Sequence, residues 1–240
     1  AVVRMRSGAG DSVQVLIGRD TRESGKWITA QLARGIESEA GSVTDGGLLS
    51  TPAVAFLTRD GKFDAGIVVS ASHNPFRDNG VKVITGDGEK ADDDLEARIA
   101  ACVADETWAV PDTPVPAVEP IAFSESYIAH TSRILNGVTV PADLRIAIDC
   151  ANGATSQLAP AVMRGLGLDP IVLHDRPDGR NINLDCGSTH PEHLAEEVVR
   201  RGADVGVALD GDADRCIMVD GAGQIVDGDQ LLFALAEDRQ

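Results

Sequence analysis

Ala65-Gly66-Ile67-Val68-Val69 is an uninterrupted apolar run that leads directly into Ser70-Ala71-Ser72-His73-Asn74-Pro75, where the side chains are small, polar or turn-forming. A strand that is apolar at every position is typical of a sheet covered on both faces, because a strand with one face in water alternates. The Asn74-Pro75 pair favours a turn. The sequence therefore predicts a buried strand over residues 65–69 with a polar loop at its carboxyl end.

Short apolar or β-branched runs alternate with longer amphipathic stretches along the rest of the chain. Further strands are predicted over residues 13–17, 81–84, 145–149, 170–173 and 204–209. Helices are predicted over residues 24–40, from about residue 92, and over 124–135, 156–165 and 191–201. This alternation favours an α/β fold of two doubly wound, mostly parallel α/β/α sandwich domains, joined near residues 136–141. We place the first domain at residues 1–140 and the second at residues 141–240.

The composition excludes several classes of protein. The chain has 240 residues and a formal net charge of −17, from 21 basic and 38 acidic side chains. Neutralising phosphates takes a basic surface, so we expect no nucleic-acid partner, and the same deficit argues against a basic membrane anchor. We also expect no membrane partner, because no apolar run approaches the roughly 20 residues that cross a bilayer.

The first residues of the chain and its cysteines indicate the cellular compartment of the protein. Ala1-Val2-Val3-Arg4-Met5 lacks the apolar region and cleavage site of a secretory signal, and the missing initiator Met suggests that the chain begins inside a longer protein. The four cysteines are far apart in the sequence and form no C-x-x-C pair. We therefore expect reduced thiols and a cytoplasmic location rather than a disulfide framework or a zinc site.

The polar loop after residues 65–69 is a candidate site, because open α/β sheets bind ligands beyond the carboxyl ends of their strands. Ser70 and Ser72 both offer a hydroxyl, and spacing does not choose between them, since both point to one side of an extended chain. His73 is a poor base for Ser72 on the same argument, because neighbours in an extended chain point to opposite sides. The G-x-S-x-G elbow of a hydrolase is absent. An ordinary serine-rich turn remains open.

A second candidate site consists of Asp210, Asp212 and Asp214, which follow the apolar run at residues 205–209. Two unit charges about 4 Å apart repel by ~4 kcal/mol at an effective dielectric near 20, and a bound cation removes that cost. Oxygen ligands select Mg²⁺, Mn²⁺ or Ca²⁺. An EF-hand does not fit, because its sixth and twelfth positions are Arg215 and Gly221 here. A solvated acidic turn remains open.

Together the two loops suggest phosphoryl transfer, which depends on positioning and on neutralising phosphate oxygens. A serine can carry a phosphoryl group as a stable ester. Lys82 and Arg215 lie beside the two loops in the sequence and could hold phosphate oxygens. Lys82 could also act as an acid or base if its pKa were depressed.

At these residues the chain resembles the α-D-phosphohexomutase superfamily, and within it the branch that acts on glucosamine phosphates. The resemblance is carried by residues 70–75, 78–82 and 210–215, and it is extended by residues 18–22, 51–55, 149–154, 181–191 and 226–230. It implies interconversion of glucosamine 6-phosphate and glucosamine 1-phosphate, on the route to UDP-N-acetylglucosamine for the cell wall. Relatives that act on mannose or glucose phosphate, and a non-catalytic sugar-phosphate-binding module, are the alternatives.

The resemblance also implies roles for particular residues. Ser72 corresponds to the phosphoserine that hands its group to a hexosamine phosphate and recovers one from the sugar bisphosphate. One Mg²⁺ per active site is implied, bound by the phosphate of Ser72 and by Asp210, Asp212 and Asp214. Lys82 corresponds to a proposed proton-transfer residue, and His73 and Arg215 are assigned to phosphate binding.

The chain also departs from the superfamily's pattern. Ala213 replaces a glycine of the metal loop, which would cost stability or shift the loop if that position has a positive φ. The superfamily's opening segment is absent, and two of its four domains would lie beyond residue 240. We therefore expect a fragment that is inactive or slow on its own, and exposed apolar faces that favour self-association.

Overall fold

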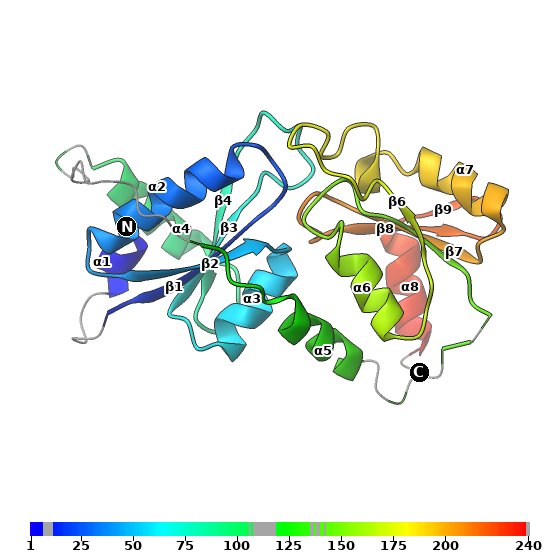
Figure 1. Cartoon of the computed structure of the whole chain (residues 1–240), viewed down its shortest axis with the longest axis horizontal. Coiled ribbons are helices and arrows are strands. Elements are labelled where there is room, and N and C mark those ends of the chain that lie inside the picture. Colours follow the sequence, from blue (N-terminus) through cyan, green and yellow to red (C-terminus); the bar gives the residue numbers. More distant parts are fainter. Residues whose placement is uncertain are drawn as a thin grey trace.

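The computed structural model describes residues 1–6, 12–105, 107, 119–134, 137, 140–141 and 143–238. Its strands form two separate sheets that lie side by side (Figure 1). The first has four strands in the order β2-β1-β3-β4, and the second has five in the order β6-β5-β7-β8-β9. The predicted α/β fold is confirmed.

The first sheet is parallel except at one edge. Its parallel strands are β1 (Gln14–Arg19), β2 (Ser42–Leu48) and β3 (Ala65–Val69), and β4 (Val81–Thr85) pairs antiparallel with β3. β3 has the predicted bounds, and all five of its residues are buried. β2 was not predicted.

Helices cover both faces of this sheet. They are α1 (Val2–Arg6), α2 (Gly25–Glu37), α3 (Thr51–Asp60) and α4 (Asp93–Val103), while α5 (Ser124–Ile134) packs against α3 rather than on the sheet. Because side chains alternate along a strand, Leu16 and Val68 pack against α3, while Ile17 and Ile67 belong to the cluster that contains Ile36 of α2. Two apolar layers therefore sandwich β1 and β3.

The start of α4 is as the sequence predicted. Asp92 is its N-cap and accepts a hydrogen bond from the backbone N–H of Leu95 at 2.8 Å, while Asp93 and Asp94 lie in the first turn. Carboxylates are favourable there because they face the positive end of the helix dipole. These three acids therefore have a structural explanation.

The second sheet is parallel in its first half only. Its strands are β5 (Ile146–Asp149), β6 (Ile171–Leu173), β7 (Val205–Leu209), β8 (Cys216–Asp220) and β9 (Ile225–Val226). β6, β5 and β7 run parallel, whereas β8 and β9 pair antiparallel. The six residues between β7 and β8 are too few for a parallel connection, which takes a dozen or more. The predicted parallel pairing therefore holds for β2-β1-β3 and for β6-β5-β7, whereas β4, β8 and β9 pair antiparallel.

Four further helices accompany the second sheet: α6 (Leu158–Gly165), the 3₁₀ turn η1 (Gly187–Thr189), α7 (Glu192–Arg201) and α8 (Gly228–Asp238). Leu194 and Val198 of α7 pack on Ala147 and Ala208 of the sheet. α6 and α8 lie on the other side of the sheet (Figure 1).

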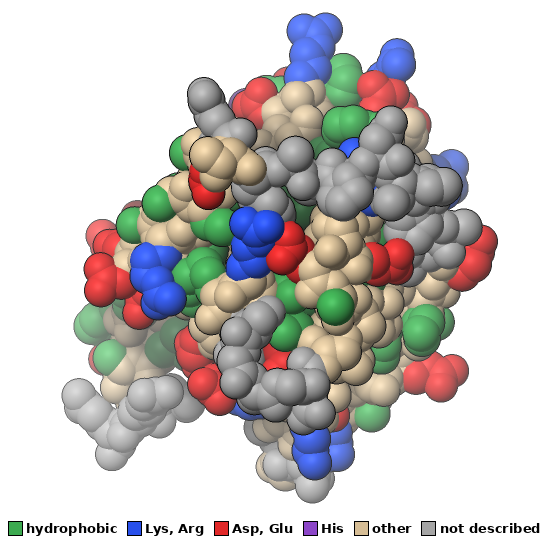
Figure 2. Space-filling model, turned by 90° about the vertical axis from the view of Figure 1, so that its left-hand side faces the viewer, with side chains coloured by type: hydrophobic (Ala, Val, Ile, Leu, Met, Phe, Trp, Pro, Cys, Tyr) green, Lys and Arg blue, Asp and Glu red, His purple; other side chains and the backbone are tan. Residues whose placement is uncertain are grey.

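The boundary between the two predicted domains lies partly outside the described residues, since 135–136, 138–139 and 142 are not described. The division at residues 140 and 141 stays a prediction. None of the described helices combines the length and the hydropathy needed to cross a membrane. On the face beside α1, α2 and α4, basic, acidic and apolar side chains are interspersed (Figure 2).

Candidate active site

The two candidate loops meet where the sheets face one another. The first follows the carboxyl end of β3, and the second follows the carboxyl end of β7. The Ser72 hydroxyl donates to Oδ2 of Asp210 at 2.5 Å, although the two residues are 138 positions apart in the sequence. A nucleophile candidate and an acidic triplet therefore share one site.

The backbone at Ser72 is not extended. Its φ is 54°, in the left-handed region that non-glycine residues rarely adopt, and its N–H donates to Oγ of Ser70 at 2.9 Å. The extended-chain argument about Ser70, Ser72 and His73 is therefore wrong in its premise. Ser70 lies behind the loop as a hydrogen-bond acceptor, and Ser72 faces the aspartates. Strain of this kind, of order 1–3 kcal/mol, is typical of functional sites.

Two side chains donate hydrogen bonds to the same two carbonyl groups of this loop. Nη2 of Arg22 donates to the carbonyl oxygens of Ser72 at 3.1 Å and Asn74 at 2.9 Å. Nδ2 of Asn183 donates to the same two oxygens at 2.9 and 3.2 Å. Arg22 is itself fixed by a buried ion pair with Asp20 at 2.9 Å. Sequence reasoning gave Arg22 and Asn183 no role, although both lie in stretches that carry the family resemblance.

The acidic triplet is concentrated and largely buried. Asp210 and Asp212 are buried, and Asp214 is exposed. One carboxylate oxygen from each lies within 4.8 Å of the others. Burial, together with the neighbouring charges of Asp212 and Asp214, raises the pKa of Asp210 above its ordinary value. A cation between these oxygens would offset both effects by favouring the charged carboxylate.

The triplet fits a hard divalent cation. Oδ1 of Asp212 is buried and has no hydrogen-bond partner in the described part of the chain. An unpartnered buried carboxylate oxygen is costly unless a charge lies against it. The donor set consists of oxygen atoms alone, which suits Mg²⁺.

Lys82 reaches into the triplet from β4. Its Nζ lies 2.5 Å from Oδ2 of Asp212 and 2.6 Å from Oδ2 of Asp214. Burial lowers the pKa of Lys82, but its hydrogen bonds to Asp212 and Asp214 outweigh this and raise the pKa above its ordinary value. The depressed pKa considered for a proton-transferring Lys82 is therefore not found, and the side chain stands here as an ammonium.

Thr51, at the beginning of α3, also contacts the triplet. Its N–H donates to the carbonyl oxygen of Asp212 at 2.9 Å, and its hydroxyl donates to Oδ2 of the same residue. Ser50 caps this helix by accepting from the N–H of Ala53. The start of α3 therefore fixes Asp212, a role that the sequence did not indicate.

His73 and Arg215 lie beside the triplet and pair with each other. Nη1 of Arg215 is 2.7 Å from Nδ1 of His73, and its backbone N–H donates to Oδ1 of Asp210 at 3.3 Å. His73 also lines a hollow of about 370 Å³ whose other walls include Arg180, Asn183 and His190. Cationic and hydrogen-bonding groups therefore line part of an open space beside His73.

The family matches divide the chain in the same way as the two sheets do. Residues 1–110 match α/β/α domain I of the phosphoglucomutase/phosphomannomutase family, and residues 125–223 match its α/β/α domain II. The chain belongs to this family.

Relatives and solved structures agree with that assignment. Over 244 residues the chain is 48% identical to the phosphoglucosamine mutase of Moorella thermoacetica, covering 98% of this chain and 53% of that protein. Over 243 residues it is 44% identical to the phosphoglucosamine mutase of Symbiobacterium thermophilum, covering 99% and 54%. A phosphoglucomutase/phosphomannomutase family protein from Burkholderia thailandensis superposes with a TM-score of 0.80 at 28% identity, covering 98% and 52%. The chain spans about half the length of the curated relatives it matches.

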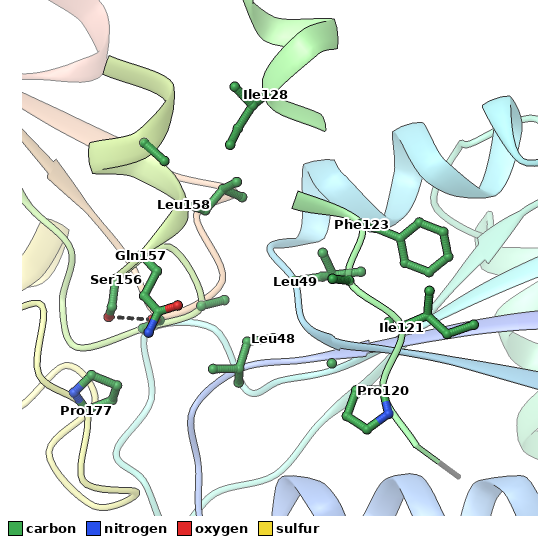
Figure 3. Close-up of a pocket in the computed structure, with 16 residues that line it drawn as sticks. Leu48, Leu49, Pro120, Ile121, Phe123, Ile128, Ser156, Gln157, Leu158 and Pro177 are labelled. Atoms are coloured by element: carbon green, nitrogen blue, oxygen red, sulfur yellow. Dashed lines mark hydrogen bonds between the residues drawn. The ribbon is translucent and has the colours of Figure 1, made fainter. Parts of the chain in front are cut away.

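A separate hollow of about 410 Å³ lies between Leu48, Leu49 and Phe123 on one side and Gln157 and Leu158 on the other (Figure 3). Its described lining contains no ionisable side chain. It therefore lacks the acid–base and charged groups that surround Ser72.

Ala213 has the positive φ that the family resemblance suggested, at 55°. An alanine in the left-handed region costs roughly 1–2 kcal/mol of stability. Replacing it with glycine removes this strain, but part of the gain is lost because glycine has more conformational entropy in the unfolded state. We expect Ala213→Gly to raise the free energy of unfolding by up to ~1 kcal/mol in urea titrations and to leave Mg²⁺ affinity equal or tighter.

The matched control is Ala222→Gly, in an exposed turn without positive φ, which should lower the free energy of unfolding. If both variants destabilise the protein equally, backbone strain at Ala213 is not the reason that glycine suits this loop.

Proposed function

We propose that the chain is the phosphoryl-carrying part of a phosphoglucosamine mutase, which interconverts glucosamine 6-phosphate and glucosamine 1-phosphate through a phosphoserine at Ser72. The 2.5 Å contact between the Ser72 hydroxyl and Asp210, within a cluster of three carboxylates and a lysine, supports it most directly. The glucosamine specificity rests on the relatives, which are phosphoglucosamine mutases.

In the proposed reaction the chain's residues position the reacting groups and neutralise charge on the phosphate. A sugar hydroxyl oxygen attacks the phosphorus of phosphorylated Ser72, the bond from phosphorus to the Ser72 oxygen breaks, the hydroxyl proton passes to the Ser72 oxygen, and a sugar bisphosphate is formed. In the second half the Ser72 oxygen attacks the other phosphorus, the bond from that phosphorus to the sugar oxygen breaks, and the Ser72 proton passes to the sugar oxygen. Arg22 and Asn183 both hold the carbonyl groups of Ser72 and Asn74, so Oγ of Ser72 stays fixed while the bond changes.

Asp210, Asp212 and Asp214 would hold the Mg²⁺, together with the phosphate of Ser72. When bound, this ion would offset negative charge on the phosphate oxygens. Lys82, whose Nζ contacts Asp212 and Asp214, is the candidate to relay the proton between the sugar hydroxyl and the Ser72 oxygen. His73 and Arg215 provide a cationic edge for phosphate oxygens.

Substrate preference tests this function. The chain is first phosphorylated with glucosamine 1,6-bisphosphate, and the loss of the phosphoryl group from the protein is then followed by intact mass as each sugar 6-phosphate is added. We expect glucosamine 6-phosphate to discharge it faster than glucose or mannose 6-phosphate. Faster discharge by glucose or mannose phosphate would overturn the glucosamine assignment, and a protein that never gains the group would favour a binding module.

Self-association is a further expectation, and exposed side chains of α8 support it. Leu232, Phe233 and Leu235 are 65%, 65% and 62% exposed. Side chains of this size on one helix favour association because contact removes apolar surface from water. We expect light scattering to give a mass above the 25.1 kDa of one chain. Phe233→Glu should return it toward that mass, and a clean monomer before the substitution would contradict the expectation.

We also infer a cytoplasmic place for this activity, ahead of UDP-N-acetylglucosamine synthesis. All four cysteines are unpaired, which suits a reducing compartment.

A further inference from the structure

A second group of metal-ligating side chains lies at the carboxyl edge of the second sheet, outside the Ser72 site. Asp149 is the last residue of β5, His174 follows β6, and Cys186 precedes η1. One donor atom from each lies within 4.8 Å of the others. Asp149 and Cys186 are buried, whereas the His174 side chain is 25% exposed and provides a path from solvent.

The backbone holds these three side chains in place. Oδ1 of Asp149 accepts from the N–H of Ala151 at 2.8 Å, and Oδ2 accepts from the N–H of Gly187 at 2.9 Å. His174 has a φ of 47°, and its carbonyl accepts from the N–H of Asn152 at 2.7 Å. Donors that are already fixed lose little entropy when they bind an ion.

The imidazole of His174 faces the carboxylate of Asp149. Nδ1 of His174 is shielded from water and lies 3.0 Å from Oδ2 of Asp149, a carboxylate that raises the pKa of the imidazole. Two ligand atoms each about 2.1 Å from one tetrahedral ion lie ~3.4 Å apart, close to this separation. The spacing of the two atoms therefore suits an ion that both could bind once the imidazole has lost its proton to solvent.

The surrounding charge also favours a cation. The exposed acids Asp175 and Asp185 lie next in sequence to His174 and Cys186. The ring of His193 also lies near the imidazole, with its centroid 5.1 Å away. Burial, followed by the charges of Asp149 and Asp185, raises the pKa of Cys186 to about 12. The thiol is thus neutral until a metal ion displaces its proton to solvent.

We propose that Asp149, His174 and Cys186 bind a divalent transition-metal ion of the Zn²⁺ class, with water in the remaining position. One sulfur, one nitrogen and one oxygen donor suit Zn²⁺ and its neighbours in the transition series, whereas the oxygen-only triplet suits Mg²⁺. The two sites therefore select different ions.

The ion would tie the segment that contains Asn183 to the second sheet. Cys186 lies three residues after Asn183, whose amide holds the loop of Ser72. β5, β6 and the turn at η1 would be joined through one centre. The expected role is structural, since the ion stiffens the partner that positions Ser72.

Co²⁺ tests the site because a cobalt–thiolate bond absorbs in the near ultraviolet and a cobalt–carboxylate bond does not. The chain, reduced and stripped of metal, is titrated with Co²⁺ in excess Mg²⁺, and Zn²⁺ affinity is measured by competition with a chelator. We expect a thiolate-to-cobalt band that Zn²⁺ abolishes and that Cys186→Ser removes. Cys150→Ser, which changes the other buried cysteine beside Asp149, should keep the band.

A second variant guards against a Cys186→Ser protein that fails to fold. His174→Asn keeps a residue that tolerates a positive φ, and it should weaken Zn²⁺ binding at least about tenfold without loss of secondary structure. Cobalt binding without a thiolate band would place the ion at the oxygen triplet and overturn the proposal. A band that survives Cys186→Ser, or Zn²⁺ affinity unchanged in a folded His174→Asn, would also overturn it.

Discussion

Replacing Ser72 by alanine should abolish phosphorylation of the chain by glucosamine 1,6-bisphosphate, a loss of at least about a thousandfold in rate, because the hydroxyl forms the covalent bond. The wild-type chain should gain the mass of one phosphoryl group, about 80 Da, and a peptide map should place it on Ser72. The substitution removes one oxygen, hydrogen bonded to Asp210, so the fold should survive. Equal unfolding curves for the two proteins would establish that.

Substitutions at two other serines distinguish loss of the phosphorylated residue from a general effect of removing a hydroxyl. Ser70 accepts the N–H of Ser72, so Ser70→Ala should slow phosphorylation without preventing it. Ser126 is exposed on α5, and Ser126→Ala should change nothing. Phosphorylation that persists in Ser72→Ala would mean that another residue carries the group and would remove the central residue of the proposed function.

The inner strands could be predicted because burial on both faces leaves an apolar run in the sequence. β3 has the predicted bounds for this reason. β2 was missed because Asp45, Gly46 and Gly47 interrupt its apolar pattern. Asp45 is tolerated there only because Arg19 of β1 pairs with it at 2.6 Å, a contact that no local pattern reveals.

The meeting of the two loops could be expected from the sheet-edge rule together with the family resemblance. Ser72 and Asp210 each follow the carboxyl end of a buried strand, which is where α/β sheets bind ligands. Their approach to 2.5 Å depends on how the two sheets pack, and spacing along the chain does not encode that distance.

The supporting residues could not be predicted because their contacts are distant in sequence. Arg22 reaches Ser72 across 50 residues, Asn183 across 111, and Thr51 reaches Asp212 across 161. The positive φ of Ser72 was equally hidden, since only glycine, asparagine and aspartate signal that conformation by residue type. The pKa of Lys82 could not be anticipated either, because its direction depends on two aspartates of the other sheet.

Asp212→Asn should weaken Mg²⁺ binding about a hundredfold, or ~2.7 kcal/mol, as measured by calorimetry. The carboxylate is fully buried, Oδ1 has no partner among the described residues, and the amide removes one charge while keeping the shape. Removing a unit charge beside a divalent ion costs several kcal/mol at an effective dielectric near 20, and repulsion within the remaining pair is relieved in partial compensation.

The melting temperature provides an independent measurement of how Asp212→Asn affects Mg²⁺ binding. A ligand at a hundred times its dissociation constant stabilises the folded state by ~2.7 kcal/mol, so Mg²⁺ should raise the melting temperature of the wild-type chain and have little effect on Asp212→Asn. Asp87→Asn removes the same charge from an exposed position and should behave as wild type. Because Lys82 can keep its contact with Asp214, the ion-free variant should remain folded. An unchanged Mg²⁺ affinity in a folded Asp212→Asn would mean that Oδ1 of Asp212 faces no metal ion, and the triplet would then be a lysine-bridged cluster only.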